Sequence, residues 1–376
     1  MQTHQADVAI VGAGILGLAH ALAAAKRGYR VVVFERTEPA VGASVRNFGL
    51  VWPIGQPDGV LFERALASRR IWQEVIAGAH LWQNPTGSLH LAYHADEAMV
   101  LEEFIGTHSG AQATDCRLLT PAEVAERSPA AKTEGLHTAL YSPNEINIDP
   151  RQAIRTLPHY LAETYGITFR FGTPVTAITM PTIETHSERW EVERVFVCSG
   201  PEFEVLYPDQ FAASGITKCK LQMLRTVPQP NGWQLGPSLC AGLTLIHYGS
   251  FAHCESLAPL RARFAEELPF YVNNGIHVLL SQTALGELTI GDHHEYGLTI
   301  SPFDREEINA AILAYLQTFA HIPDFIIAER WHGVYAPLPG KSEWISHPEP
   351  GVTIVNGIGG VGMTLSFGLA EEVMGT

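Results

Sequence analysis

The sequence predicts an α+β/α/β fold in which a parallel-sheet domain, discontinuous along the chain, is interrupted by a mainly antiparallel sheet. Three observations predict it. A strand–glycine turn–helix–strand pattern occupies the first 36 residues, strand-like runs dominate residues 218–300, and a second strand–glycine turn–helix pattern occupies residues 352–374. Because α/β character returns at the end of the chain, we interpret the strand-rich region as an insertion. The expected domains are 1–85, 145–215 and 325–376 for the first, and 86–144 and 216–324 for the second.

The first pattern is a complete dinucleotide-binding fingerprint. The motif Gly12-Ala13-Gly14-Ile15-Leu16-Gly17 lies between an apolar run, Val8–Val11, and a helical segment that reaches Arg27. Its first glycine permits a tight turn, its second lets the backbone approach a pyrophosphate, and its third allows close packing of helix and strand. A second apolar run, Val31–Phe34, ends in Glu35, which can accept hydrogen bonds from ribose hydroxyls. The pattern therefore predicts a Rossmann-type domain.

A targeting segment is the alternative reading of this region. Residues 8–25 form a segment long enough for a signal peptide or a membrane span, and His20 is its only polar residue. However, no Lys or Arg precedes the run, Asp7 lies at its edge, and three glycines stand at motif spacing. We expect no membrane span and a cytoplasmic protein.

Composition restricts the possible partners. The formal net charge of −15 argues against nucleic acid, whose phosphates it would repel. The five cysteines are scattered and odd in number, which fits free thiols in a reducing compartment. His293-His294 is the one candidate metal pair, but adjacent side chains on a strand point to opposite faces. We expect no metal.

The remaining elements follow from periodicity and turn chemistry. Helices are expected at Val60–Ile76, at Asp96–Thr107, after the capping box Thr120-Pro121-Ala122-Glu123, from Asp149-Pro150 to Thr164, at Pro302–Phe319 and at Met363–Met374. Strands are expected at Ser88–Tyr93, Ile167–Phe171, Val175–Thr179, Arg194–Val197, Leu221–Val227, Leu243–Phe251, His277–Ser281, Leu288–Ile290 and Val352–Asn356. Pro158 is expected to kink or split the helix that contains it.

The second glycine turn, Gly357-Ile358-Gly359-Gly360-Val361-Gly362, points to a flavin. It would place another helix N-terminus against the bound cofactor, where a positive dipole end can stabilise negative charge on a reduced flavin ring. A simple glycine-rich helix cap is the alternative. A dehydrogenase that uses NAD alone and a non-catalytic flavin-binding protein are further alternatives; the colour of the protein and bleaching by amines would separate them.

The motifs resemble, in order, those of the FAD-dependent amine oxidoreductases that include glycine oxidase, sarcosine oxidase and D-amino-acid oxidase. The matching segments are the first fingerprint, Val33-Phe34-Glu35-Arg36, Gly172-Thr173-Pro174-Val175, Val197-Cys198-Ser199-Gly200 and the C-terminal glycine turn. The resemblance implies a discontinuous FAD-binding domain with an inserted substrate-binding domain.

The resemblance also implies roles for single residues. It assigns the cofactor to Gly12, Ala13, Gly14, Ile15, Leu16, Gly17, Glu35, Arg36, Ser44, Arg46, Asn47, Gly49, Leu50, Val175, Ser199, Gly200, Gly359, Gly360, Val361, Gly362, Met363 and Thr364. The segment Ala43–Leu50, which would wrap the pyrophosphate and the ring, contains neither His nor Cys. We therefore expect non-covalent FAD.

One position departs from the amino-acid-oxidising members. Their pattern Trp-x-Gly-Leu-Arg-Pro uses the Arg to bind the substrate carboxylate, whereas Trp331-His332-Gly333-Val334-Tyr335-Ala336 places Tyr335 there. A bidentate carboxylate clamp is therefore missing. This favours a substrate other than an ordinary α-amino acid.

A narrower resemblance points to a subfamily linked to aminophosphonate breakdown. The segments Ser44–Pro57, Gly291–Gly297 and Gly360–Gly368 carry it. It implies oxidation of a 2-aminoethylphosphonate derivative, hydroxylated on carbon or methylated on nitrogen. Candidate residues for the substrate anion are Arg46, His247, Tyr248, His277, His332, Tyr335 and Lys341.

The expected reaction is oxidation of a C–N bond in a small anionic amine. Hydride passes from the α-carbon to flavin N5, and the imine hydrolyses to an aldehyde and ammonia or methylamine. No residue is assigned as a general base, and the electron acceptor is oxygen or another compound. A glycine, sarcosine or D-amino-acid oxidase acting on an amino carboxylate is the alternative.

Overall fold

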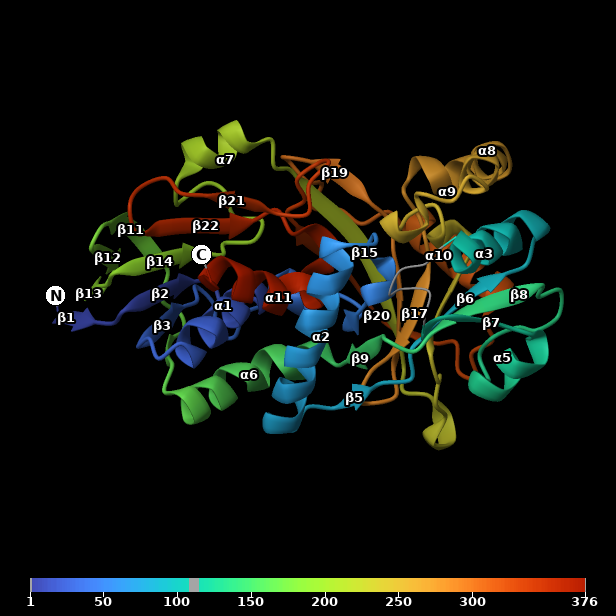
Figure 1. Ribbon diagram of the computed structural model, residues 1–376, viewed down its shortest axis with the longest axis horizontal. Coiled ribbons are helices and arrows are strands. Elements are labelled where there is room, and N and C mark those ends of the chain that lie inside the picture. The colour runs from blue at the N-terminus through green and yellow to red at the C-terminus, as the bar shows by residue number, and fades with distance from the viewer. Residues whose placement is uncertain (1, 108–114, 376) are drawn as a thin grey trace.

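The computed structural model describes residues 2–107 and 115–375, and Figure 1 shows two lobes side by side. One lobe contains a six-stranded sheet of order β10-β3-β2-β14-β22-β21, and the other contains a nine-stranded sheet. Within the described part of the chain, no helix is long and apolar enough to cross a membrane.

The six-stranded sheet confirms the predicted Rossmann-type pattern. Its strands are β2 (Val8–Val11), β3 (Val31–Phe34), β10 (Thr168–Arg170), β14 (Arg194–Val197), β21 (Trp344–Ser346) and β22 (Val352–Asn356). All neighbours are parallel except β21 and β22. The continuous Val and Ile runs fit this arrangement because a parallel sheet is covered on both faces.

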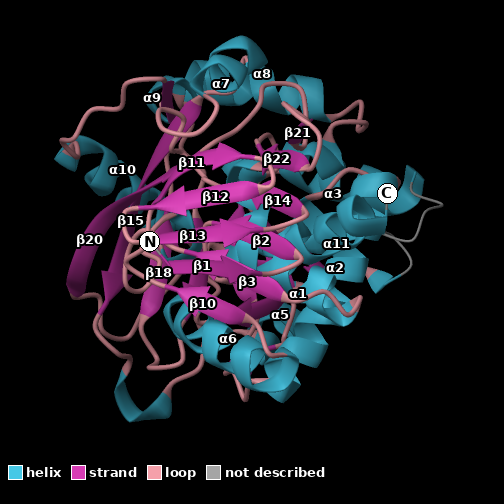
Figure 2. Ribbon diagram, turned by 90° about the vertical axis from the view of Figure 1, so that its left-hand side faces the viewer, coloured by secondary structure: helices cyan, strands magenta, loops and turns pink. Residues whose placement is uncertain are grey.

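Helices cover one face of this sheet. They are α1 (Ile15–Lys26), α2 (Val60–Gly78), α6 (Pro150–Tyr165) and α11 (Gly362–Gly375). Figures 1 and 2 show α1 and α11 together beside β2 and β14. A Cβ built on Gly362 would lie 3.5 Å from Ile15 Cγ2, so the starts of α1 and α11 are in contact. The two glycine turns therefore meet, although they are separated by more than 300 residues.

A smaller sheet and a short helix cover the opposite face. The sheet has the order β1-β13-β12-β11, with strands Gln2–Gln5, Glu188–Glu191, Thr182–Thr185 and Val175–Thr179, and α7 spans Pro208–Ser214. Strand β14 shows how the two faces are separated. Val195 and Val197 pack in the core on this side, whereas Phe196 packs in the core beneath α1 and α11, as the two-residue period of a strand requires.

The nine-stranded sheet forms the second lobe and is mainly antiparallel, as predicted. Its strands are β6 (Ser88–Ala92), β7 (Arg117–Leu119), β8 (Thr138–Ser142), β15 (Lys218–Thr226), β16 (Ser238–Ala241), β17 (Leu279–Gln282), β18 (Leu288–Gly291), β19 (Glu295–Gly297) and β20 (Ile327–Tyr335). Only β6 and β16 are parallel among these described pairs. Helices α3 (Ala95–Thr107), α5 (Pro121–Arg127), α8 (Leu257–Glu267), α9 (Pro269–Asn273) and α10 (Glu306–Phe319) surround it.

A three-stranded sheet connects the lobes. It contains β4 (Leu50–Val51), β9 (Ile146–Ile148) and β5 (Gln83–Asn84). Strand β20 lies within the predicted segment 325–376 but pairs along its length with β15 of the larger sheet. The domain boundary predicted at residue 325 therefore assigns β20, a strand of the larger sheet, to the wrong segment.

One predicted strand is wrong in form, and one predicted helix break is absent. Residues 243–251 were expected to be a strand, but they form two 3₁₀ turns, Gly242–Thr244 and Gly249–Phe251. The side chains of Leu243 and Leu245 are buried in this segment. A short apolar run is typical of a buried strand but also of other buried backbone, so it does not identify a strand by itself. Pro158 does not split α6; the helix continues to Tyr165 with Pro158 on its buried side, so packing outweighs the missing hydrogen bond.

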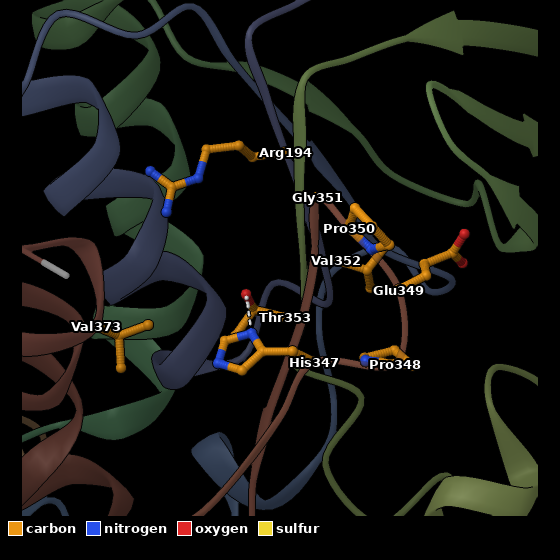
Figure 3. Close-up of a pocket in the computed structure, with 9 residues that line it drawn as sticks. All are labelled: Arg194, His347, Pro348, Glu349, Pro350, Gly351, Val352, Thr353 and Val373. Atoms are coloured by element: carbon orange, nitrogen blue, oxygen red, sulfur yellow. Dashed lines mark hydrogen bonds between the residues drawn. The ribbon is translucent and has the colours of Figure 1, made fainter.

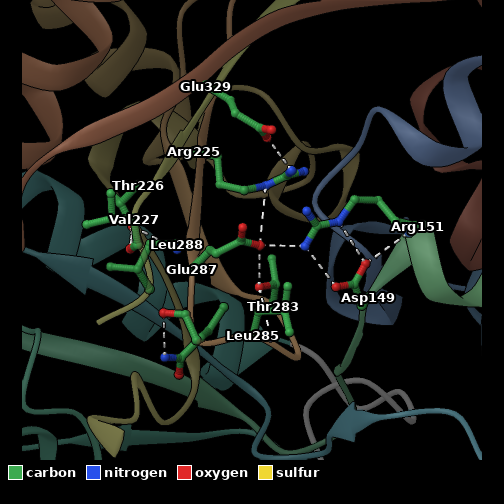
Figure 4. A network of polar contacts seen from close by, with 12 residues as sticks. Asp149, Arg151, Arg225, Thr226, Val227, Thr283, Leu285, Glu287, Leu288 and Glu329 are labelled. Carbon is green, nitrogen blue, oxygen red and sulfur yellow. Dashed lines mark hydrogen bonds and ion pairs between the residues drawn. The ribbon is translucent and has the colours of Figure 1, made fainter. Parts of the chain in front are cut away.

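A network of charged side chains crosses the interface between the lobes (Figure 4). Asp149 caps the start of α6 and pairs with Arg151 at 3.0 Å. Arg151 also contacts Glu287 at 2.5 Å, on the approach to β18. Arg225 of β15 pairs with Glu329 of β20 at 2.6 Å and lies 3.9 Å from Glu287. The network therefore couples the N-terminus of α6 to β15, β20 and the turn before β18 of the larger sheet.

Candidate functional site

The first glycine turn is closely packed at the carboxyl end of the parallel sheet. Gly12 has φ +104°, and a Cβ built on it would lie 2.4 Å from the Cys198 carbonyl oxygen. A Cβ on Gly17 would lie 1.9 Å from the Gly12 carbonyl oxygen. A side chain fits at neither position without movement of backbone. The tight turn and the close helix–strand packing predicted for these glycines are thus present.

Glu35 lies beside this turn at the end of β3. One carboxylate oxygen accepts a hydrogen bond from the Ala13 N–H at 2.9 Å, and the other accepts from the Thr37 N–H and hydroxyl at 3.0 and 2.8 Å. Thr173 donates its N–H to the Glu35 carbonyl, which brings the segment leading to Val175 to the same place. Each carboxylate oxygen has two lone pairs, so the second lone pair of Oε2 can still accept from one ribose hydroxyl.

The segment 43–50 wraps the start of α1. Ser44 Oγ accepts a hydrogen bond from the Ile15 N–H at 2.9 Å. Asn47 holds the segment in shape, because its side chain donates to the Ala43 carbonyl and accepts from the Gly49 N–H. These contacts fit the predicted position against a pyrophosphate, at a helix N-terminus that favours anions.

The second glycine turn completes the carboxyl edge of the sheet. Gly359–Val361 form a 3₁₀ turn directly before α11. Thr364, one turn into α11, accepts a hydrogen bond from the Trp52 N–H at 3.0 Å. Between the two turns, the Gly200 carbonyl accepts from the Asn356 side chain at 2.9 Å. The predicted cofactor residues thus gather at the edge where open α/β sheets bind nucleotides, except Arg36, whose side chain is exposed.

Aromatic and imidazole side chains lie next to the second glycine turn. Tyr335, at the end of β20, lies 3.4 Å from a Cβ built on Gly360 and 6.5 Å, centroid to centroid, from the His294 ring. His247 and His277 stack with a centroid distance of 3.7 Å, and Tyr248 lies 5.7 Å from His277. The structure therefore brings four predicted substrate residues, His247, Tyr248, His277 and Tyr335, to one region.

Two residues of this region, Asp292 and His294, were not predicted as site residues. The sequence contained a signal for both residues, because they lie in the segment 291–297 that carries the narrower resemblance. Asp292 is buried, and burial raises the pKa of its carboxyl to about 6. His277 Nε2 lies 3.1 Å from an Asp292 carboxylate oxygen, and burial holds the pKa of His277 well below its ordinary value. His277 is therefore neutral at pH 7.

Three other predicted substrate residues lie elsewhere. His332 occupies the opposite face of β20 from Tyr335, as alternation along a strand requires, and its Nδ1 lies 3.0 Å from Asp304. Arg46 donates to the His332 carbonyl at 3.2 Å, so its guanidinium is directed at β20. Lys341 is exposed in the turn after β20. His332 and Lys341 therefore lie outside the site, because nearness to Tyr335 in sequence does not bring their side chains to it.

A hollow on the surface is unrelated to this region. It is lined by Arg194, Val373 and the segment 347–353, as Figure 3 shows. These residues include the starts of β14 and β22. The hollow therefore lies at the amino edge of the parallel sheet, opposite the edge that holds both glycine turns.

Comparisons with known proteins agree with this geometry. A glycine oxidase from Geobacillus kaustophilus (strain HTA426) is 27% identical over 210 residues, which is 53% of this chain and 55% of that protein. The match thus spans about half the length of that curated relative. Crystal structures of L-proline dehydrogenase from P. horikoshii and of glycine oxidase from Geobacillus kaustophilus are each 20% identical and cover 99% of this chain and 92% and 94% of theirs. Their TM-scores of 0.78 and 0.73 show the shared fold.

The family assignment rests on the whole chain. The family model described as "DAO: FAD dependent oxidoreductase" matches residues 7–375. The match includes both glycine turns and the entire inserted sheet. With the residues at the carboxyl edge of the sheet fitting a dinucleotide, the chain belongs to the DAO family of FAD-dependent oxidoreductases.

Proposed function

We propose that this enzyme oxidises the C–N bond of a small amine whose anionic group is a phosphonate. The substrate would be a 2-aminoethylphosphonate derivative, hydroxylated on carbon or methylated on nitrogen, and the products an aldehyde and ammonia or methylamine. The observation that carries the proposal is the position of Tyr335. It replaces the carboxylate-binding Arg of the resembling oxidases and packs against Gly360, with His294 next to it.

The chain's own residues would hold FAD without a covalent bond. Glu35 would bind the ribose, the first glycine turn and Ser44 the pyrophosphate, and the segment 359–364 the ring. When bound, FAD supplies the hydride acceptor for the amine. Acid precipitation of the yellow protein should release all of its flavin as FAD; colour that stays with the precipitate would contradict the non-covalent assignment.

The Tyr335 and Tyr248 hydroxyls suit a tetrahedral anion. Burial raises the pKa of Tyr335 and of Tyr248 well above the ordinary value, so both hydroxyls stay protonated and can donate. Several converging donors match the three oxygens of a phosphonate, whereas a carboxylate is best matched by one planar guanidinium. Trp52 packs beside Tyr248 with a centroid distance of 6.2 Å and helps to exclude water.

Anaerobic stopped-flow reduction of the flavin tests the substrate class. 2-Aminoethylphosphonate and its N-methyl derivative are compared with β-alanine, which differs in the anion alone, and with glycine, sarcosine and D-alanine. The phosphonates should reduce the flavin faster. Tyr335→Phe should lower kcat/KM for the phosphonate roughly tenfold to a hundredfold, because a hydrogen bond to a charged group is lost. His332→Ala is the matched control and should leave the preference unchanged.

An amino-carboxylate oxidase is the second candidate. The 27% identity to a glycine oxidase favours it. Faster reduction by glycine or sarcosine than by either phosphonate would establish this candidate and overturn the first. We further propose that the enzyme is cytoplasmic and that it passes electrons to oxygen or to another acceptor. Reoxidation of the reduced enzyme in air-saturated buffer tests whether oxygen is the acceptor.

A further inference from the structure

Three imidazoles from separate segments form a cluster in the larger lobe. We call His247, His277 and His294 the histidine cluster. The ring centroids of His247 and His294 lie 4.8 Å apart, and those of His277 and His294 lie 5.4 Å apart. One ring nitrogen from each residue lies within 4.8 Å of the other two. This is the spacing of a site that small side-chain rotations can close around one ion.

The second nitrogens of two rings face acceptors. His294 Nδ1 lies 2.9 Å from the Gly275 carbonyl oxygen, which can only accept, so this nitrogen carries the proton and Nε2 carries the lone pair. His277 Nε2 lies 3.1 Å from Asp292 Oδ1, although this contact does not have hydrogen-bond geometry. Metal-binding histidines are oriented in this way, by a carbonyl or carboxylate on the nitrogen that does not bind.

His277 provides an independent observation. Its side chain is 4% exposed and its Nδ1 has no hydrogen-bond partner among the described residues. An acceptor buried without a partner costs about 1–3 kcal/mol. A bound ion would remove this cost, because it would accept the Nδ1 lone pair.

We propose that the histidine cluster binds one divalent transition-metal ion of the zinc class. Three imidazoles without a thiolate suit zinc, copper or nickel, and a set of three histidines leaves a coordination position open. Zinc–nitrogen bonds of about 2.0–2.1 Å place tetrahedral ligands roughly 3.4 Å apart, so the cluster must contract. His247 can supply this movement, because its side chain is exposed.

The open position would face the substrate, and this part of the proposal rests on the proposed function. Tyr335 neighbours both His294 of the cluster and Gly360, so an oxygen of the substrate anion could bind the ion while its amine end approaches the second glycine turn. The ion acts only as a charge that binds and orients the anion. The proposal departs from the sequence-based expectation of no metal, since the three ligands follow no spacing motif.

Equilibrium dialysis of the holoenzyme against Zn²⁺, after treatment with EDTA, tests the site without using a substrate. We expect one Zn²⁺ per chain by elemental analysis. His247→Ala and His294→Ala should each abolish stoichiometric binding, while flavin absorbance per chain confirms that they are folded. His332→Ala is the control, because it removes an imidazole paired with a carboxylate outside the cluster, and it should bind zinc like the parent.

Asp292→Asn tests the orienting contact. Loss of such a partner typically weakens metal affinity about 10–100-fold, so the variant should bind zinc with a correspondingly higher Kd. The proposal is overturned if the parent binds no stoichiometric zinc, or if the two cluster variants bind it as tightly as the parent. Failure of phosphonates to reduce the flavin would contradict the proposed substrate and leave the metal result unaffected.

Discussion

At the scale of single residues, volume at the glycine turns decides what can bind. Gly14 has φ −68°, a conformation open to any residue, so it does not need to be glycine for its backbone angles. Among the described residues, a Cβ built on it meets only Ser44 Oγ, at 3.1 Å. The absence of a side chain at Gly14 therefore serves the approach of a ligand and of Ser44, which caps Ile15.

Gly14→Val should yield a folded protein that has lost most of its FAD. The branched side chain would occupy the space proposed for the pyrophosphate and push against Ser44, while β2 and α1 remain packed. The measurement is visible flavin absorbance per chain, with circular dichroism to monitor folding. Gly106→Val is the control, since a Cβ at Gly106 meets no atom of the described residues within 4 Å, and it should retain its flavin. Full FAD occupancy in Gly14→Val would show that the first glycine turn does not bind the cofactor.

At the scale of elements, the polar network at the lobe interface is more deeply buried than the surface ion pair of Arg189 and Glu184. Arg225 is 6% exposed and Glu287 15% exposed, and Glu287 accepts from Arg151 and from the Thr283 hydroxyl. Removing one partner of such a set leaves charge that is poorly solvated. Arg189 and Glu184, by contrast, are 49% and 41% exposed, where water replaces the partner.

Glu287→Gln should lower the free energy of unfolding by about 1–3 kcal/mol, because two guanidinium groups lose their shared carboxylate. Glu184→Gln removes a carboxylate of the same kind from the surface pair and should cost less than about 1 kcal/mol. Urea unfolding of both holoenzyme variants, followed by tryptophan fluorescence, provides the comparison. Equal midpoints for the two variants would show that the network does not stabilise the lobe interface.

At the scale of the whole molecule, buried histidines link stability to pH. Burial lowers the pKa of His20 to about 4 and that of His90 to about 3. In the unfolded chain both have the ordinary value of about 6.5. The unfolded state therefore binds more protons below that pH, so stability is complete above about pH 6.5 and falls as the pH is lowered toward the folded values.

His90→Leu should make this acid loss of stability shallower. His90 lies 1% exposed between Trp52 and Phe251, and neither ring nitrogen has a hydrogen-bond partner among the described residues. An apolar side chain of similar size should therefore be tolerated at pH 7. Thermal unfolding between pH 4 and pH 7 measures the slope. His159→Leu changes an exposed histidine and should keep the parent slope. An unchanged slope in His90→Leu would exclude His90 as a source of the pH dependence.

The sequence by itself determined the parts of this protein that depend on local chain geometry. A glycine turn between a strand and a helix needs only neighbouring residues to define it, so both turns and the four long strands of the parallel sheet were predicted with close boundaries. Glu35 could be placed for the same reason, because its distance along the chain from Gly17 sets its position at the sheet edge.

Tertiary structure alone decided which side chains meet. His332 and Tyr335 are near neighbours in sequence, but the pairing of β20 with β15 turns one toward Asp304 and the other toward Gly360. His247, His277 and His294 come from separate segments and are joined by the packing of turns at the end of the larger sheet. Long-range pairing of this kind has no local pattern, because the register of strands and the burial of apolar residues elsewhere in the chain determine it.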